Sequence, residues 1–363
     1  MSPVSGTPAP RGAGWEGPPP QEVCIVMLSA IGDAVHVLPV ANALKRAWPE
    51  TRITWVIQPG PHALVRGHPA VDEFIVFHRR PGLGAWRPFA EFARAVRGRR
   101  FDLLLGLQVY FKAGFLTALA PAEVKLGFDR ARARDLQWLV TNARIQAHVP
   151  QHVQDQYLEF ARFLGVDPEP VTWDLRLTDA ERDVQAAFFG ALGEPAMAVV
   201  VGTSDPRKNW TVEGYARVLD EAEHRHGLRA VLVGGPSRAE RALAAAVLAK
   251  TSARVMDALG DDIRKLLWIV DGSALTLSPD TGPLHVSRAV RTPVVGLFGR
   301  TNPKRTGPYR AYGELVVDGY AECPGEDYPL EHTYRDGMKR ITADMVLEKV
   351  ALAVRRYGVQ GGA

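Results

Sequence analysis

The sequence predicts an α/β fold of two doubly wound halves, each built on a parallel sheet with helices on both faces. From residue 22 onward, short apolar runs alternate with amphipathic segments, and the alternation restarts near residue 198. Such alternation is typical of βαβ units, whose parallel strands are buried on both faces. The length of 363 residues exceeds the usual size of one domain and favours two separate cores.

Each apolar run is predicted as a strand, and each segment of helical periodicity as a helix. In the first half, we expect strands over 23–28, 53–57, 74–77 and 102–107, and helices over 33–48, 89–96 and 152–164. In the second half, we expect strands over 198–201, 230–233, 274–277 and 293–298, and helices over 212–226, 239–249, 284–290 and 342–357.

Changes in composition divide the chain into four parts. Residues 1–20 are rich in Pro and Gly without an apolar core, which predicts a flexible tail and not a signal peptide. A stretch dense in Pro, Asp and Gly over about 168–195 separates the halves, so we expect domains over 21–180 and 181–340. The last helix, within 341–363, is expected to pack on one of the two halves, and packing back on the N-terminal domain is one option.

The composition excludes several classes of protein. Hydrophobic residues make up 46% and charged residues 23% of the chain, which is ordinary for a folded globular protein. No apolar stretch reaches the ~20 residues that cross a bilayer. Two distant cysteines, Cys24 and Cys323, match no metal spacing and fit a reducing compartment. A cytoplasmic location is therefore expected.

Basic residues are unevenly distributed, although the net charge of +4 is small. They gather in the first half, over 78–80, 94–100 and 130–134, and this suggests an anionic partner there. Solvated helix faces would explain each run equally well. No recognition motif accompanies the charge, so nucleic acid is not expected as a partner.

Ligands of doubly wound sheets bind beyond the carboxyl ends of the strands, and the first such turn covers residues 27–36. It lacks the G-x-G-x-x-G fingerprint, which argues against a nicotinamide dehydrogenase. Gly32 allows a substrate to approach closely, and Asp33 follows at the start of the helix. Asp33 either caps that helix, which contributes ~1 kcal/mol, or acts as a general base kept ionised by the positive helix end.

The second turn, over 201–210, offers hydroxyls and a lysine above the sheet. Thr203, Ser204 and Lys208 would suit phosphate oxygens, with Lys208 as a mobile positive charge. The alternative is a polar loop whose Thr211 caps the next helix.

The third turn, over 280–285, places an acid, a hydroxyl, a glycine and a proline where a helix begins. The first turn of a helix has unpaired N–H groups and about half a positive charge, which suits a diphosphate. Pro283 lacks an N–H group at a position where it would be unpaired. Asp280 would repel phosphate, so we expect it to face a sugar hydroxyl or to order the turn. His285 is either a ligand contact or a hydrogen-bonded packing residue.

A fourth turn, over 296–309, follows a buried strand and is expected on the same rim as the third, where it would either wall the ligand site or form a long ordered loop. No cluster of His, Cys or paired acids predicts a metal site.

Together these turns resemble glycosyltransferase family 9, the ADP-heptose:lipopolysaccharide heptosyltransferases. The resemblance rests on the order of four motifs, over 28–39, 208–210, 280–285 and 301–309. It implies the GT-B architecture, in which two Rossmann-like domains face each other across a cleft, and an inverting transfer without a metal. The implied donor is ADP-heptose. The implied acceptor is a Kdo- or heptose-bearing inner core on lipid A, met by peripheral contact with the cytoplasmic face of the inner membrane.

The same resemblance assigns roles to residues. Asp33 matches the base that deprotonates the acceptor hydroxyl, and no cofactor is implied besides the donor sugar nucleotide. The implied donor site comprises Thr203, Ser204, Lys208, Leu259, Asp280, Thr281, Gly282, Pro283, Leu284 and His285. The acceptor is assigned to Ser29, Ala30, Gly32, Arg130 and Arg132. Preorganised N–H groups and Lys208 would then stabilise the charge on the leaving diphosphate.

The chain departs from the family pattern at two places. Arg300 and Asn302 stand where members commonly have Pro and Asp, and Ser237 and Arg238 stand where an acid near the ribose is expected. Glu240 is the nearby candidate for that acid. Two other functions stay open: a GT-B-like enzyme with another nucleotide sugar, including an epimerase, and a non-catalytic sugar-nucleotide binding protein.

Overall fold

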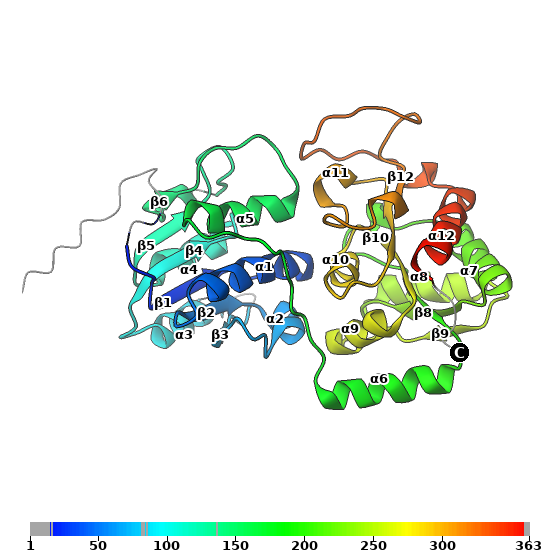
Figure 1. Cartoon of the computed structure of the whole chain (residues 1–363), viewed down its shortest axis with the longest axis horizontal. Coiled ribbons are helices and arrows are strands. Elements are labelled where there is room, and N and C mark those ends of the chain that lie inside the picture. The colour runs from blue at the N-terminus through cyan, green and yellow to red at the C-terminus, as the bar shows by residue number, and fades with distance from the viewer. Residues whose placement is uncertain (1–14, 16, 81–83, 85, 136, 359–363) are drawn as a thin grey trace, which may run out of the picture. The chain divides into compact units, whose positions relative to one another are not determined.

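The computed structural model describes residues 15, 17–80, 84, 86–135 and 137–358 (Figure 1). Within the predicted tail over 1–20, residues 1–14 and 16 lie outside these residues. The chain forms two compact units, the first with residues up to Val149 and Gln154–Asp174, the second with Pro150–Val153 and the residues from Leu175 on. Each unit contains one parallel six-stranded sheet, which confirms the predicted α/β class.

The sheet of the first unit has the strand order β3-β2-β1-β4-β5-β6, and all its strand pairs are parallel. Its strands are β1 (Glu22–Val26), β2 (Arg52–Ile57), β3 (Glu73–Val76), β4 (Phe101–Gly106), β5 (Ala122–Gly127) and β6 (Ala143–Arg144). Its helices are α1 (Ile31–Ala47), α2 (Pro59–Val65), α3 (Arg87–Ala95), α4 (Phe111–Leu119) and α5 (Val153–Phe163).

The sheet of the second unit has the order β12-β11-β10-β7-β8-β9 and is also parallel. Its strands are β7 (Ala196–Val200), β8 (Arg229–Val233), β9 (Val255–Asp257), β10 (Leu275–Pro279), β11 (Val294–Phe298) and β12 (Val316–Asp318). Its helices are α6 (Asp179–Leu192), α7 (Val212–His226), α8 (Arg238–Leu248), α9 (Ile263–Gly272), α10 (Gly282–Ala289), α11 (Pro303–Thr306) and α12 (Ala343–Tyr357).

Both sheets reverse their winding direction once, and the reversal decides where a ligand can bind. In the first unit the reversal lies between β1 and β4, and in the second unit between β7 and β10. Loops that follow the two strands at such a point diverge and leave room for a ligand. The loops after β1 and β4, and those after β7 and β10, are therefore the places where each unit can hold a substrate.

Helix α12 belongs to the second unit. It packs on α7, and its Val346, Val350 and Ala353 lie in the hydrophobic core that also contains side chains of β7, β8, β10 and β11. Of the two placements expected for the last helix, the structure therefore shows the one on the C-terminal half, because this apolar stripe is buried there.

Candidate active site

Asp33 lies in the first turn of α1, immediately after the loop that follows β1. The backbone N–H of Ala30 donates to Asp33 Oδ2 over 3.0 Å. This bond satisfies a backbone donor at the helix start, as the capping interpretation expects. It occupies one carboxylate oxygen and fixes the side chain at the switch point of the first sheet.

A second donor reaches the other oxygen of Asp33. The hydroxyl of Tyr157, on α5, donates to Asp33 Oδ1 over 3.1 Å. Tyr157 is buried, and 124 positions separate it from Asp33 in the chain. No local pattern in the sequence marks such a contact, and Tyr157 was missed for that reason.

The loop before α1 is held by the loop after β4. Gln108 accepts from the N–H of Leu28 over 2.9 Å and donates to the carbonyl of Ser29 over 2.6 Å. Gln137 in turn donates to the carbonyl of Gln108 over 2.8 Å. These buried glutamines were not singled out in the sequence, because an isolated Gln carries no motif.

A cavity of about 330 Å³ opens beside this loop in the first unit. Its lining includes two cations, an acid, two amides and two aromatic rings. The lining residues are Leu28, Ser29, Gln58, Arg79, Gln108, Tyr110, Phe111, Lys112, Ala113 and Asp135. Of the five predicted acceptor residues, Ser29 is part of this lining. Arg79 and Lys112 make the cavity suited to an anionic sugar.

The three basic runs of the sequence lie at different edges of the sheet. Arg79 follows β3 and Arg130 follows β5, at the carboxyl edge that also holds Asp33. The run over 94–100 instead precedes β4, at the opposite edge, where Arg99 pairs with Glu73 over 2.7 Å. Only two of the three runs are therefore placed to meet a ligand of this edge.

Arg132 is used inside the fold. Its guanidinium pairs with Asp129, donates to Glu159 over 2.7 Å and reaches the carbonyl of Gln146 over 2.8 Å. These partners tie the loop after β5 to α5, which gives Arg132 a structural role that the sequence did not show. Arg130 is exposed, with its guanidinium 4.7 Å from the ring centroid of Trp138.

In the second unit, Lys208 and Asp280 join the two loops of the switch point. Lys208 ends the short 3-10 helix η3 (Pro206–Lys208) after β7, and Asp280 follows β10. The ammonium group of Lys208 lies 2.9 Å from Asp280 Oδ2 and 3.0 Å from the carbonyl of Asp280. A lysine and an acid that are 72 positions apart thus form one unit of the site.

Asp280 is buried and surrounded by partners. Thr301 donates to its Oδ2 over 2.5 Å, Thr306 donates to the same oxygen over 3.3 Å, and His285 Nε2 lies 3.7 Å from its Oδ1. Burial would raise the pKa of Asp280, but His285, Lys208 and Thr301 outweigh it and hold the pKa well below its usual range. Asp280 thus joins the loop after β10 to the loops after β7 and β11, and its role toward a ligand stays a prediction.

The start of α10 presents backbone donors at the same edge. The N–H groups of Thr281 and Gly282 have no hydrogen-bond partner within the part of the chain that the structure describes. The N–H of Leu284 differs from its predicted role as a diphosphate contact, because it donates to the carbonyl of Thr281 over 3.0 Å. Pro283 and His285 are buried. Two amides, not three, are thus available at this tip.

The other predicted donor residues have different surroundings. Thr203 is half-buried and donates to the carbonyl of Asp205 over 2.6 Å, whereas Ser204 is exposed. Leu259 is 6% exposed and belongs to the hydrophobic core of the second unit. Glu240 accepts from the N–H of Gly235 over 2.9 Å, and its side chain fills the space beside Gly202. Its carboxylate therefore lies between the carboxyl ends of β7 and β8.

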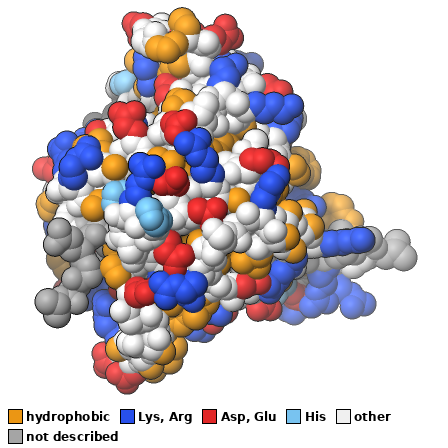
Figure 2. Space-filling view, turned by 90° about the vertical axis from the view of Figure 1, so that its right-hand side faces the viewer, with side chains coloured by type: hydrophobic (Ala, Val, Ile, Leu, Met, Phe, Trp, Pro, Cys, Tyr) orange, Lys and Arg blue, Asp and Glu red, His pale blue; other side chains and the backbone are white. Residues whose placement is uncertain are grey.

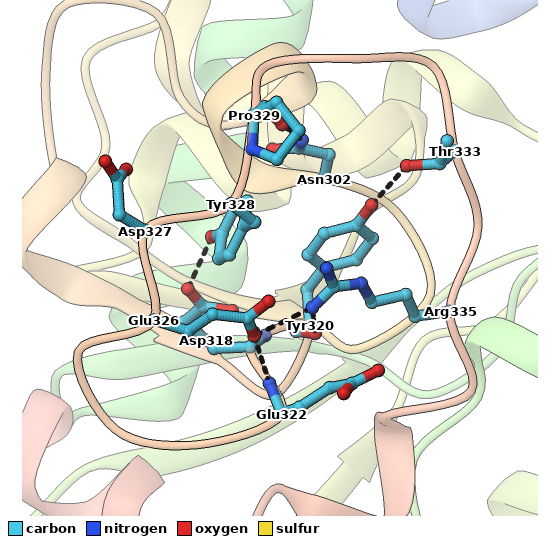
Figure 3. Close-up of polar contacts among 12 residues, drawn as sticks. Asn302, Asp318, Tyr320, Glu322, Glu326, Asp327, Tyr328, Pro329, Thr333 and Arg335 are labelled. Atoms are coloured by element: carbon cyan, nitrogen blue, oxygen red, sulfur yellow. Dashed lines mark hydrogen bonds and ion pairs between the residues drawn. The ribbon is translucent and has the colours of Figure 1, made fainter.

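The segment over 319–337 packs against the loop that follows β11 and forms backbone hydrogen bonds with it (Figure 3). Asn302 donates to the carbonyl of Pro329 over 2.8 Å, and Tyr328 donates to Asp318 over 2.5 Å. Arg335 donates to Glu326 over 2.8 Å, and its guanidinium lies 4.5 Å from the ring centroid of Tyr320. Asn302, one of the departures from the family pattern, thus anchors this segment.

Neither a metal-binding cluster nor a membrane-spanning helix is found among the residues that the structure describes. No group of three or more His, Cys, Asp or Glu side chains there could hold a metal ion. None of the helices described is both long and apolar enough to cross a membrane. On the face that Figure 2 shows, Lys and Arg side chains are interspersed with Asp and Glu side chains.

Fold and site define a glycosyltransferase with two Rossmann-like units. Residues 89–326, more than half of the chain, match glycosyltransferase family 9 (heptosyltransferase), and the chain belongs to this family. The lipopolysaccharide core heptosyltransferase OpsX of Haemophilus influenzae is 29% identical over 85% of this chain and 87% of its own length.

Solved structures share the fold. The glycosyl transferase family 9 protein of Veillonella parvula matches with a TM-score of 0.77 at 21% identity and covers 92% of this chain and 97% of its own. The E. coli heptosyltransferase WaaC with ADP matches with a TM-score of 0.69 at 23% identity, covering 93% and 99% of the two chains.

Proposed function

We propose that this protein transfers heptose from ADP-heptose to the inner core of lipopolysaccharide, with inversion at the anomeric carbon and without a metal ion. The proposal rests on Asp33, a carboxylate fixed at the switch point of the first sheet beside a cavity that carries Arg79 and Lys112. It is supported by relatives such as OpsX, whose name states lipopolysaccharide core heptosyltransferase, and by the structure of WaaC with ADP.

In the proposed reaction, Asp33 accepts the proton of an acceptor hydroxyl. The oxygen then forms a bond to the anomeric carbon of the heptose while the bond from that carbon to the diphosphate breaks, and ADP leaves with the electron pair. Attack from the face opposite the leaving group inverts the configuration. A general base of this kind contributes about 10²–10⁴-fold to the rate.

The donor is assigned to the second unit. The N–H groups of Thr281 and Gly282 and the ammonium group of Lys208 are preorganised positive charge for the diphosphate. Glu240 is the proposed partner of the ribose hydroxyls, since its carboxylate lies between the ends of β7 and β8. Thr203 and Ser204 follow the same strand as Lys208 and are assigned to the phosphates.

The acceptor is assigned to the first unit. Kdo carries a carboxylate and lipid A carries phosphates, and the cations Arg79 and Lys112 in the cavity would pair with such groups. Ser29, Ala30 and Gly32 bring the backbone close to the acceptor hydroxyl, and the exposed Arg130 adds charge at the same edge. Arg132 is left out of this proposed site because its guanidinium already binds Asp129 and Glu159.

The decisive experiment compares two carboxylates of the same unit. Purified protein is given ADP-heptose and a Kdo-bearing lipid A acceptor, and ADP and glycosylated product are both measured. We expect Asp33→Asn to lower kcat about 10²–10⁴-fold with donor affinity nearly unchanged. The control is Asp135→Asn, in the lining of the cavity, which should cost less than about tenfold.

Each alternative function predicts a different result in this assay. An epimerase would release nucleotide without glycosylating the acceptor, and another donor would turn over only when UDP-, GDP- or CMP-sugars replace the ADP-sugar. A binding protein would give no product at all. Full activity of Asp33→Asn would refute the assigned base, and inhibition by EDTA would refute the metal-independent step.

We further propose a cytoplasmic enzyme that contacts the inner membrane peripherally through the rim of the acceptor cavity. Tyr110 and Phe111 are 56% and 65% exposed and line the cavity together with Arg79 and Lys112. Trp86 is 69% exposed, and its ring centroid lies 6.0 Å from that of Phe115 on α4, the helix that begins with Phe111. Aromatic rings favour the membrane interface, and each basic residue near an anionic surface adds about 1 kcal/mol.

Vesicles test this surface. Binding should require phosphatidylglycerol mixed into phosphatidylcholine and should fall severalfold in the double variant Trp86→Ser, Phe111→Ser. The matched control is Tyr334→Ser, which removes a ring that is 53% exposed in the second unit. Equal binding of all three proteins would contradict the assignment.

A further inference from the structure

Tyr157 connects α5 to the proposed base. Its hydroxyl donates to Asp33 Oδ1 over 3.1 Å, while the N–H of Ala30 donates to Asp33 Oδ2 over 3.0 Å. One donor therefore belongs to the loop before α1, and the other to a different helix. A carboxylate with both oxygens bonded is restrained in rotation as well as in position.

The ring of Tyr157 is itself held in place. It is 7% exposed, stacks on His36 of α1 with 6.3 Å between ring centroids, and meets the edge of Phe128 at 6.5 Å. A buried ring between two other rings has little rotamer freedom. The position of its hydroxyl is thus set by packing.

Helix α5 is fastened on both sides of Tyr157. One turn earlier, Gln154 lies 2.9 Å from His36 Nδ1 and donates to the carbonyl of His36 over 2.8 Å. Two residues later, Glu159 pairs with Arg132 over 2.7 Å. These bonds fix α5 against α1 and against the loop after β5. Because α5 is fixed, the position of the Tyr157 hydroxyl group is fixed as well.

We propose that Tyr157 is a positioning residue for the base, holding the Asp33 carboxylate in the orientation that receives the acceptor proton. A carboxylate oxygen has two lone pairs, so accepting one of these hydrogen bonds does not by itself prevent it from taking up a proton. This inference rests on the proposed function, in which Asp33 is that base. Loss of the hydroxyl would remove the bond that holds Asp33 Oδ1 and would loosen the orientation of the carboxylate.

The expected effect follows from geometry. Misplacement of a reacting group by about 1 Å costs up to about 10²-fold in rate. We expect Tyr157→Phe to lower kcat about 10–50-fold, because the ring and its packing stay while the bond to Asp33 is lost. KM for donor and acceptor should stay within about twofold, since Tyr157 is not assigned to either substrate.

Two variants separate positioning from packing. Tyr215→Phe makes the same change in a buried tyrosine of the second unit, whose hydroxyl donates to the carbonyl of Val200 over 2.9 Å, and it should leave kcat unchanged. Phe128→Leu loosens the packing of the Tyr157 ring and keeps its hydroxyl. It should lower the unfolding temperature more than Tyr157→Phe does and lower kcat less.

Asp33→Asn and the double variant with Tyr157→Phe complete the experiment. If Tyr157 acts through the base, adding Tyr157→Phe to Asp33→Asn causes no further loss of kcat. Wild-type kcat in Tyr157→Phe, additive losses in the double variant, or equal losses of kcat in Phe128→Leu and Tyr157→Phe would overturn the inference. The assigned base fails separately, when Asp33→Asn itself keeps its activity, and the proposed transfer fails when the wild-type protein forms no glycosylated product.

Discussion

Asp33 and Asp280 are aspartates at the switch points of two similar sheets, and different contacts hold them in place. Asp33 accepts hydrogen bonds from two uncharged donors, a backbone N–H and the hydroxyl of Tyr157. Asp280 is 6% exposed and lies against Lys208, His285 and two threonines. Asp33 follows the first strand of its sheet and Asp280 the fourth strand of its sheet, on the two sides of a switch point, and the same residue type is held for two different tasks.

The comparison of these two aspartates shows how the charge of the hydrogen-bond donors affects a carboxylate. Neutral donors orient an acid and leave its charge available for a proton. A lysine that pairs with a buried carboxylate compensates its negative charge, so that the acid has a structural role. We accordingly expect Asp33 to matter for rate and Asp280 to matter for stability and for the placement of Lys208.

The largest expected effect is on stability. Asp280→Asn leaves the ammonium group of Lys208 without its carboxylate in a poorly solvated place and should lower the free energy of unfolding by about 3 kcal/mol. Asp33→Asn should lower it by less than about 1 kcal/mol, the worth of a helix-start carboxylate. Urea unfolding of both variants measures this, and equal losses would erase the contrast between the two sites.

Lys208 tests the donor side of the comparison. Lys208→Met keeps the length of the side chain and removes the charge. We expect the dissociation constant for ADP-heptose to increase 10–100-fold. Arg207→Met is the matched control on the same short helix, where Arg207 pairs with Asp205 over 2.8 Å in a largely exposed position. Calorimetric titration should show less than about a twofold change for the control.

The acceptor side is tested by three cations of the first unit. Arg79→Met and Lys112→Met should each raise KM for the acceptor about five- to tenfold, the worth of one exposed charge-assisted bond. Arg132→Met should leave this KM unchanged and lower the unfolding temperature, because Arg132 holds Asp129 and Glu159. A raised acceptor KM in Arg132→Met, without loss of stability, would restore its predicted role.

The smallest expected effect concerns pH. The pKa of Asp280 is lower in the folded protein than the value of about 3.9 in an unfolded chain. Its contribution to stability is complete above that value and is lost as the pH falls through the folded value, because the unfolded chain binds the proton first. Urea midpoints at pH 5 and pH 3 should differ more in the wild type than in Asp280→Asn. Identical differences would show that Asp280 is not ion-paired in solution.

Much of the fold was predictable, because the strands of a buried parallel sheet have sequences that consist of short apolar runs. All fifteen expected helices and strands are present within two residues of their predicted bounds, including β1, α1, α5, β10 and α10. Helix α6 was missed since it lies in the Pro- and Asp-rich stretch taken as a boundary, and it begins with a Thr178 cap and Glu181. Helix α9 was missed although Asp262 caps it, because a short apolar run such as 266–270 does not distinguish a helix from a strand.

The site was predictable only where its residues share a local motif. Asp33, Lys208 and the turn over 280–285 were found from the sequence because turns between strands and helices have recognisable chemistry. Tyr157, Gln108 and the lining residue Lys112 were not, since each acts across a distance that only folding closes. The amide of Leu284 and the guanidinium of Arg132 were assigned to ligands, because a sequence does not show whether a donor is already used.

The sequence by itself determined the α/β class with two parallel sheets, the order of the fifteen expected strands and helices, and the loops in which Asp33, Lys208 and the turn over 280–285 lie. Those features follow from local periodicity and turn chemistry, which act between neighbours in the chain. The tertiary structure alone decided that Asp33 meets Tyr157 and that Asp280 meets Lys208. Contacts between distant residues depend on how the sheets wind and pack, and they set the charge and the orientation of each carboxylate.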